Sequence, residues 1–276
     1  MLPLRDTIPS RYTPFVNYAM IGLCLIVYLV QATSDHEAQD IVERFGMIPA
    51  RVWHPHEQLM ISEVTEVETP MGTRLVKVER PLASSPIPAW LTLLTCTFLH
   101  GGLMHFVGNM WFLFIFGDNV EDRLGHVGYL IFYLASGVLA SLTHLLTNSQ
   151  STIPTVGASG AIAGVMGAYF YLYPRARVVT LVPIFIVVQV MVLPASIFLG
   201  IWFVLQFLQG VVTVGGEPTA GVAWWAHIGG FVVGLGAVAL LNRAGWIRSA
   251  PSQAAEMAGW HWGRAELDDR RDRRYF

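Results

Sequence analysis

Two residues far apart in the sequence carry the side chains of a serine hydrolase. Ser159 lies in the run GASG at positions 157–160, and His227 lies in the run AHIGG at positions 226–230. A serine hydroxyl is a weak nucleophile until a base accepts its proton, and a neutral imidazole is the commonest such base. The pair therefore indicates nucleophilic attack on a carbonyl, provided that the fold brings the two side chains together.

Each of these residues also has a purely structural interpretation. Serine is a preferred N-cap, and for an isolated G-x-S-G the cap is the more frequent role. The same helix start offers unpaired N–H groups and a positive dipole end, which stabilise an oxyanion. His227 alone is as compatible with a buried histidine bonded to a backbone carbonyl as with a catalytic base. The spacing differs from G-x-S-x-G and so does not indicate an α/β-hydrolase.

A second pair of polar residues lies in an apolar segment upstream. His105 and Asn109 are spaced i, i+4, so they share one face of a helix. Both side chains donate hydrogen bonds, as an oxyanion hole requires. The alternative for this pair is hydrogen bonding between helices, which is the more frequent role of such residues in membranes. His100, in the run HGG, is expected to brace the loop that leads into this helix.

Small residues recur where the helices carrying these side chains would pack. Gly230 and Gly234 form a G-x-x-x-G spacing, and Gly160 and Gly164 form another. This spacing lets helix backbones approach closely in membranes. Gly157 removes a side chain beside the serine, so a substrate backbone has room to approach. We interpret these five glycines as structural support for the site.

Composition indicates that the bilayer is the main solvent. Of 276 residues, 54% are hydrophobic and 13% are charged, whereas soluble domains carry about 25% charged residues. The net charge of −2 gives no reason to expect a nucleic-acid partner. Cys24 and Cys96 are the two cysteines, and they lack the spacing of a metal site or a disulfide framework. We therefore expect neither a structural zinc site nor a disulfide framework.

Six apolar runs qualify as membrane spans, because a spanning helix needs about 20 mostly apolar residues. They are Phe15–Thr33, Leu103–Phe116, His126–Thr147, Gly157–Tyr173, Ala195–Val214 and Gly221–Leu241. A further stretch, Val178–Leu193, is short and interrupted by Pro183, so we expect it to lie on the bilayer or to dip into it. An even number of spans places most arginines that flank the spans on one side, which predicts that both termini are cytoplasmic.

Six spans have a geometric consequence for the polar residues. The second, fourth and sixth spans all run from outside to inside. His105, Asn109, Ser159 and His227 lie near the starts of these spans, so we expect them at one depth, a turn or two below the outer surface. Polar groups inside a bilayer are costly and mark functional sites by default.

The remaining segments complete the predicted organisation. Residues 1–242 form the membrane domain, with a first loop at 34–88 outside the membrane and a polar cytoplasmic tail at 243–276. Alternation in Glu63–Glu68 and Thr73–Glu79 around a turn at Thr69–Gly72 predicts a β-hairpin in this loop. The tail is expected to be mobile or to form an interfacial helix through Trp260 and Trp262.

The three polar motifs together resemble one family, the rhomboid intramembrane proteases. They are HGGLMHFVGN at 100–109, GASG and AHIGG, and the runs LPLRD at 2–6 and EDRLG at 121–125 are similar to bacterial members. The resemblance implies an all-α bundle of six transmembrane helices that cleaves transmembrane protein substrates in the lipid bilayer without metal or ATP. It implies that Ser159 is the nucleophile and His227 the base. His105, Asn109 and the Ser159 N–H would form the oxyanion hole. A bacterial inner membrane fits this resemblance.

The sequence departs from the family at two positions. Trp90-Leu91 stands where Trp-Arg is frequent, and Ala163 stands where some members carry an aromatic residue that stacks on the histidine. Two alternatives to a protease remain at this stage. One is an inactive relative that binds transmembrane segments. The other is a transporter with His105 and His227 in a proton path, which the absence of acidic or basic residues at this level of the spans disfavours.

Overall fold

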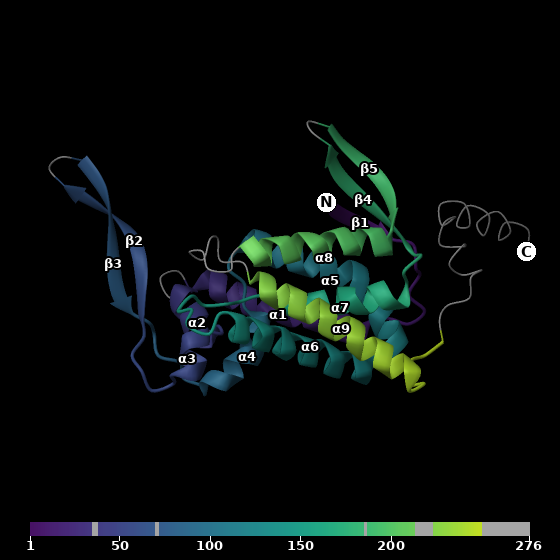
Figure 1. Cartoon of the computed structure of the whole chain (residues 1–276), viewed down its shortest axis with the longest axis horizontal. Coiled ribbons are helices and arrows are strands. Elements are labelled where there is room, and N and C mark those ends of the chain that lie inside the picture. Colours follow the sequence, from purple (N-terminus) through teal and green to yellow (C-terminus); the bar gives the residue numbers. More distant parts are fainter. Residues whose placement is uncertain (35–37, 70–71, 185–186, 213–222, 250–276) are drawn as a thin grey trace, which may run out of the picture.

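The computed structural model describes residues 1–34, 38–69, 72–184, 187–212 and 223–249. The main helices of this part run side by side along the long axis of the molecule (Figure 1). They are α1 (Phe15–Thr33), α5 (Leu103–Leu124), α6 (His126–Thr147), α7 (Ser159–Leu172), α8 (Ala195–Val212) and α9 (Trp224–Arg243). The protein is therefore mostly helical, as its composition predicts.

Helix length and hydropathy separate these helices into three groups. Among the described residues, α1, α6, α8 and α9 are long and apolar enough to cross a membrane, and α5 becomes a fifth candidate span with the preceding segment Ala89–Phe98, across a bend of 78°. Helix α7 is apolar but has only 14 residues. The count of six spans stays a prediction, because these criteria identify four or five.

Helix α7 lies at the centre of the bundle. Ten consecutive residues, from Gly160 to Tyr169, are buried, and α7 packs against α5, α6, α8 and α9. A helix surrounded on all sides has no need of a polar face, which explains the mostly apolar sequence of α7. At 1.5 Å per residue it is about 21 Å long, shorter than a bilayer core of about 30 Å. Its first residue can therefore lie below the membrane surface.

The second predicted span is longer than expected. Helix α5 ends at Leu124 and not at Phe116, because the charged residues in its last two turns are accommodated inside the protein. The carboxylate of Glu121 accepts the backbone N–H groups of Val16 and Asn17, at 3.0 and 2.7 Å. These are the unpaired donors at the start of α1. Because the Glu121 carboxylate is hydrogen-bonded to the start of α1, its charge does not end α5.

A three-stranded antiparallel sheet contains the segment that connects α7 to α8. Strands β4 (Arg177–Ile184) and β5 (Val187–Pro194) form a hairpin, and β1 (Leu2–Asp6) adds to β4. The expectation that Val178–Leu193 lies on or dips into the bilayer stays a prediction, and the structure adds that this segment forms a β-hairpin. Its many branched side chains favour strands, and the N-terminal segment supplies a pairing partner far away in sequence. The hairpin projects from the flank of the bundle (Figure 1).

The first loop contains the predicted hairpin and short helices. Strands β2 (Met60–Thr69) and β3 (Gly72–Pro81) pair with Thr69 opposite Gly72. The expected hairpin is therefore confirmed, while residues 70–71 lie outside the described residues. The helices are α2 (Ala38–Phe45), α3 (Pro49–Trp53) and α4 (Thr92–Thr95), and the 3-10 turns are Ala89–Leu91 and Cys96–Phe98. The tail helix proposed for Trp260 and Trp262 also lies outside the described residues.

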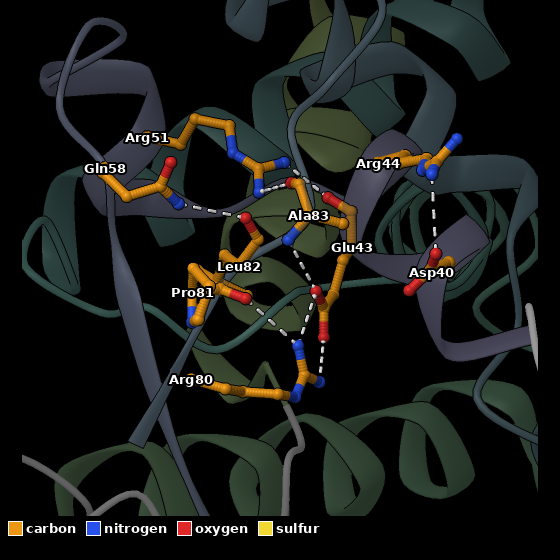
Figure 2. Close-up of polar contacts among 9 residues, drawn as sticks. All are labelled: Asp40, Glu43, Arg44, Arg51, Gln58, Arg80, Pro81, Leu82 and Ala83. Atoms are coloured by element: carbon orange, nitrogen blue, oxygen red, sulfur yellow. Dashed lines mark hydrogen bonds and ion pairs between the residues drawn. The ribbon is translucent and has the colours of Figure 1, made fainter.

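A partly buried ion pair ties the base of this hairpin to α2, as Figure 2 shows. The Glu43 carboxylate accepts two bonds from Arg80, at 2.5 and 3.2 Å, and one from the Ala83 N–H at 2.9 Å. Arg51 donates to the backbone carbonyls of Glu43 and Ala83. Burial raises the pKa of Glu43, but the bonds from Arg80 and Ala83 outweigh it and leave that pKa lowered.

Candidate active site

The structure brings Ser159 and His227 into hydrogen-bond contact. Ser159 is the first residue of α7 and His227 lies in the first turn of α9. The His227 Nε2 lies 2.8 Å from the Ser159 Oγ. Both side chains are half-buried. This distance suits a nucleophile and its base, although 68 residues separate the two positions in the chain.

Close backbone packing of α7 and α9 makes this contact possible. A Cβ added to Gly230 would overlap the carbonyl oxygen of Gly160, and one added to Gly234 would overlap that of Gly164. The two helices therefore touch through backbone atoms at two successive turns. Gly160 and Gly164 themselves face α6, where an added Cβ would lie 2.7 Å from the Ala140 Cβ and 2.6 Å from the Ser136 Cβ, respectively. Each of these four glycines thus occupies a contact that a larger residue would break.

The turn before α7 places Gly157 against His105, one of the second pair of polar residues. Gly157 has a φ of +129°, which side-chain-bearing residues rarely adopt, and its N–H donates to the Cys96 carbonyl at 2.9 Å. An added Cβ would lie 2.8 Å from the Nε2 of His105. The His105 Nδ1 accepts the N–H of Gly101 at 3.3 Å. That bond leaves the ring hydrogen on Nε2, so His105 presents a donor beside the serine turn.

Asn109 lies one turn further along α5 than His105. Its side chain is buried at 8% exposure, and its Nδ2 has no hydrogen-bond partner among the described residues. An unpaired buried amide donor costs about 1–3 kcal/mol, so a donor left free in a folded protein needs an explanation. Asn109 lines the same cavity as Ser159 and His227. A ligand atom that accepts a hydrogen bond in that cavity would remove the cost.

His100 lies beside His105, and its ring makes no hydrogen bond to Ser159 within the described part of the chain. Its backbone exchanges two hydrogen bonds with the side chain of Gln31 on α1, at 3.0 and 3.2 Å. Its ring packs edge-on against the rings of His105 and Phe106. These contacts fit the brace predicted for the loop before α5.

A cavity of about 600 Å³ contains the four polar residues. This volume is within the range of ligand sites, about 300–1,000 Å³. Its walls include Phe112 on α5 and Trp202 on α8. The cavity is therefore lined by both polar and apolar side chains.

Three residues of α8 and α9 surround the imidazole, and the sequence analysis overlooked them. Gln206 Oε1 lies 2.7 Å from His227 Nδ1. The rings of Trp202 and Trp224 lie 5.9 and 6.2 Å from the imidazole, respectively. The sequence contained a signal for Gln206, because it is a polar residue in an apolar span and lies four residues after Trp202, on the same helix face. The described residues contain no group of three or more His, Cys, Asp or Glu side chains that could hold a metal.

Comparison with known proteins identifies the family. The family model of the Rhomboid domain matches residues 88–244. RHOMBOID-like protein 4 of Arabidopsis thaliana is 32% identical over 174 residues, which is 59% of this chain and 38% of that protein. Rhomboid-like protein 11, chloroplastic, of the same plant is 42% identical over 77 residues, 28% of this chain and 27% of that protein. Rhomboid protease GluP of Bacillus subtilis (strain 168) is 39% identical over 83 residues, 30% of this chain and 16% of that protein.

The matched part is a small share of these relatives, because this chain covers only 27% and 38% of the length of the two plant proteins. The matched domain includes His105, Asn109, Ser159 and His227. The chain belongs to the rhomboid family and is a multi-pass integral membrane protein.

Proposed function

We propose that this protein is an intramembrane serine endopeptidase that cleaves transmembrane protein substrates with a Ser159–His227 dyad. Membership of the rhomboid family supports a protease-like function. The observation that carries the proposal is the 2.8 Å contact between the serine hydroxyl and the imidazole. It lies in a cavity large enough for an extended peptide segment.

The first step is acylation of the serine. Ser159 Oγ attacks the scissile carbonyl carbon while its proton moves to Nε2 of His227. The carbonyl oxygen becomes an oxyanion. Asn109 Nδ2, His105 Nε2 and the N–H of Ser159 at the start of α7 are the donors that would stabilise it. The partnerless Asn109 amide supports this assignment, since such an oxygen would be its missing acceptor.

The second step restores the enzyme. The C–N bond breaks as the imidazolium gives its proton to the leaving amine, which leaves an ester on Ser159. Water then loses a proton to His227 and attacks this ester, and the acid product departs as the serine regains its hydrogen. Both steps use the one imidazole, first as base and then as acid.

The substrate class follows from the position of the site. Short α7 starts inside the bundle, and the cavity above it is bounded by aromatic residues on α5 and α8. A substrate helix in the bilayer would have to unwind locally to present its backbone to Ser159. We propose lateral entry between these walls.

We further propose that the six helices each cross a bacterial cell membrane, with residues 1–242 as the membrane domain and 243–276 as a cytoplasmic tail. In this arrangement both termini are cytoplasmic, and the loop at 34–88 and the catalytic cavity face the outside. Arg11 contacts Asp122 at 2.8 Å and Arg123 bonds to the backbone of Arg248 at 2.8 Å. Positive charge thus gathers at the end of the bundle opposite the site, which supports this orientation.

The test is cleavage of single-span substrate proteins in proteoliposomes. We expect turnover by the unchanged protein and by Ser196→Ala, a matched serine in the first turn of α8. We expect none by Ser159→Ala or His227→Ala. Substrate capture without cleavage by the unchanged protein would refute the protease and favour an inactive relative that binds transmembrane segments. Equal cleavage by Ser159→Ala would refute the dyad.

A further inference from the structure

The imidazole of His227 has a second polar contact on the side away from the serine. Gln206 projects from α8, two turns or so before the helix ends at Val212, and its Oε1 lies 2.7 Å from His227 Nδ1. Nε2 of the same ring faces Ser159 at 2.8 Å. The ring is therefore held at both nitrogens, by groups from two different helices.

The contact at one nitrogen decides what the other nitrogen can do. A neutral imidazole carries one hydrogen, and the two nitrogens are a donor and an acceptor. To accept the proton of Ser159, Nε2 must be the bare nitrogen, so the hydrogen must be on Nδ1. An amide oxygen facing Nδ1 accepts that hydrogen and favours this tautomer. The opposite tautomer would place two acceptors face to face at Nδ1 and remove the base from the serine.

We propose that Gln206 is a positioning residue that fixes the tautomer and the orientation of His227. The inference rests on the proposed function, because it matters only if His227 is the base. In soluble serine proteases a buried aspartate performs this task. Here the group is neutral. A carboxylate inside a bilayer is costly, whereas an amide oxygen accepts the same hydrogen without introducing a charge.

The surroundings of Gln206 support a fixed geometry. Trp202 lies one turn earlier on the same face of α8, and its ring is 5.9 Å from the imidazole with 36° between the planes. Trp224 meets the imidazole edge-on at 88°. Further along, α8 and α9 pack closely at Gly210, where an added Cβ would lie 3.1 Å from the Cδ1 of Ile228. These contacts hold the amide at its distance from the ring.

The variant that tests this is Gln206→Leu, which removes the acceptor and keeps a side chain of similar size. Gln206→Glu is the rescue variant, since a carboxylate also accepts a hydrogen at Nδ1. Gln209→Leu is the matched control, because Gln209 lies on the same helix but is exposed. Each protein is labelled with ¹⁵N-histidine, and the signals of His227 among the nine histidines are assigned by their loss in His227→Gln.

We expect the ¹⁵N spectrum of the unchanged protein to show hydrogen on Nδ1 of His227, and the same in Gln209→Leu and Gln206→Glu. In Gln206→Leu the Nε2–H tautomer becomes populated. We expect kcat for a transmembrane substrate to fall about 10- to 100-fold, the size of a general-base contribution that is partly lost. KM should change less than twofold, because leucine keeps a side chain of similar size in the cavity wall and the substitution acts through the base.

Two results would overturn the inference. One is hydrogen on Nε2 in the unchanged protein. The other is an unaltered spectrum and an unaltered kcat in Gln206→Leu. Failure of the proposed function would look different from both results. In that case neither the unchanged protein nor any variant cleaves substrate, while the spectra still report the tautomer of His227.

Discussion

The glycine contact between α7 and α9 sets the distance between Ser159 and His227, the proposed nucleophile and base. Enlarging one of these glycines should therefore lower activity although the glycine touches neither residue. Gly234 lies seven residues after His227, about two turns away, and touches neither reacting group. In Gly234→Ala the new Cβ would overlap the carbonyl oxygen of Gly164 and lie 2.6 Å from its Cα. Carbon atoms normally approach to about 3.5–4.0 Å. The helices must therefore part by about 1 Å.

A displacement of this size is large for catalysis. Misplacing reacting groups by about 1 Å can cost about 100-fold in rate, which corresponds to about 2.7 kcal/mol of transition-state stabilisation. We expect kcat of Gly234→Ala to fall by about that factor. Overpacking should also lower the free energy of unfolding by about 1–3 kcal/mol.

The assay compares substrate cleavage and thermal unfolding for two alanine variants of one helix. Gly236→Ala is the control, since an added Cβ at Gly236 would meet nothing within 4 Å. We expect this variant to match the unchanged protein in both measurements. Full activity in Gly234→Ala, or an equal loss in both variants, would refute the claim that backbone contact sets the catalytic distance.

Three further predictions concern other contacts. Asn109→Ala should lower kcat about 10²–10³-fold with little change in KM, and an unaltered rate would exclude Asn109 from the oxyanion hole. Glu43→Gln should destabilise the first loop by about 1–3 kcal/mol, which limited proteolysis would detect as faster cleavage. Because the pKa of Glu43 is lowered, the stability that its carboxylate contributes is present at neutral pH and is lost as pH falls below the ordinary value of 4.5. Equal acid resistance of the variant and the unchanged protein would contradict this prediction. Burial raises the pKa of Asp6 to about 7, although a hydrogen bond from Tyr169 opposes the shift. The docking of β1 should therefore weaken as pH rises from about 4 to 7. Hydrogen exchange of the β1 amides, corrected for intrinsic rates, should show this weakening, and Asp6→Asn should abolish the pH dependence.

The sequence predicted Ser159 and His227 as a pair because their polar side chains stand out in an apolar chain. Ser159, His227 and Asn109 are costly inside a bilayer, and the glycine spacing beside them indicated which helices pack. Helical character follows from the same composition. The hairpin in the first loop was visible as alternation around a turn.

The parts that sequence did not reveal depend on partners distant in the chain. The β4–β5 hairpin is stabilised by β1, about 175 residues earlier in the sequence, and a window of neighbouring residues contains no trace of that pairing. Helix α5 extends past Phe116 because α1 supplies N–H groups to Glu121. Gln206 was overlooked because an amide in an apolar span has no evident chemical role until the fold places it beside the imidazole of His227.

The most direct test of the account maps the residue that reacts with a fluorophosphonate. The protein in detergent is treated with the reagent, digested and analysed by mass spectrometry. If Ser159 is a nucleophile activated by His227, a single adduct forms on Ser159, and it is lost in His227→Ala although that variant unfolds at the same temperature. An adduct on another serine, or equal labelling of Ser159 without His227, would contradict the account.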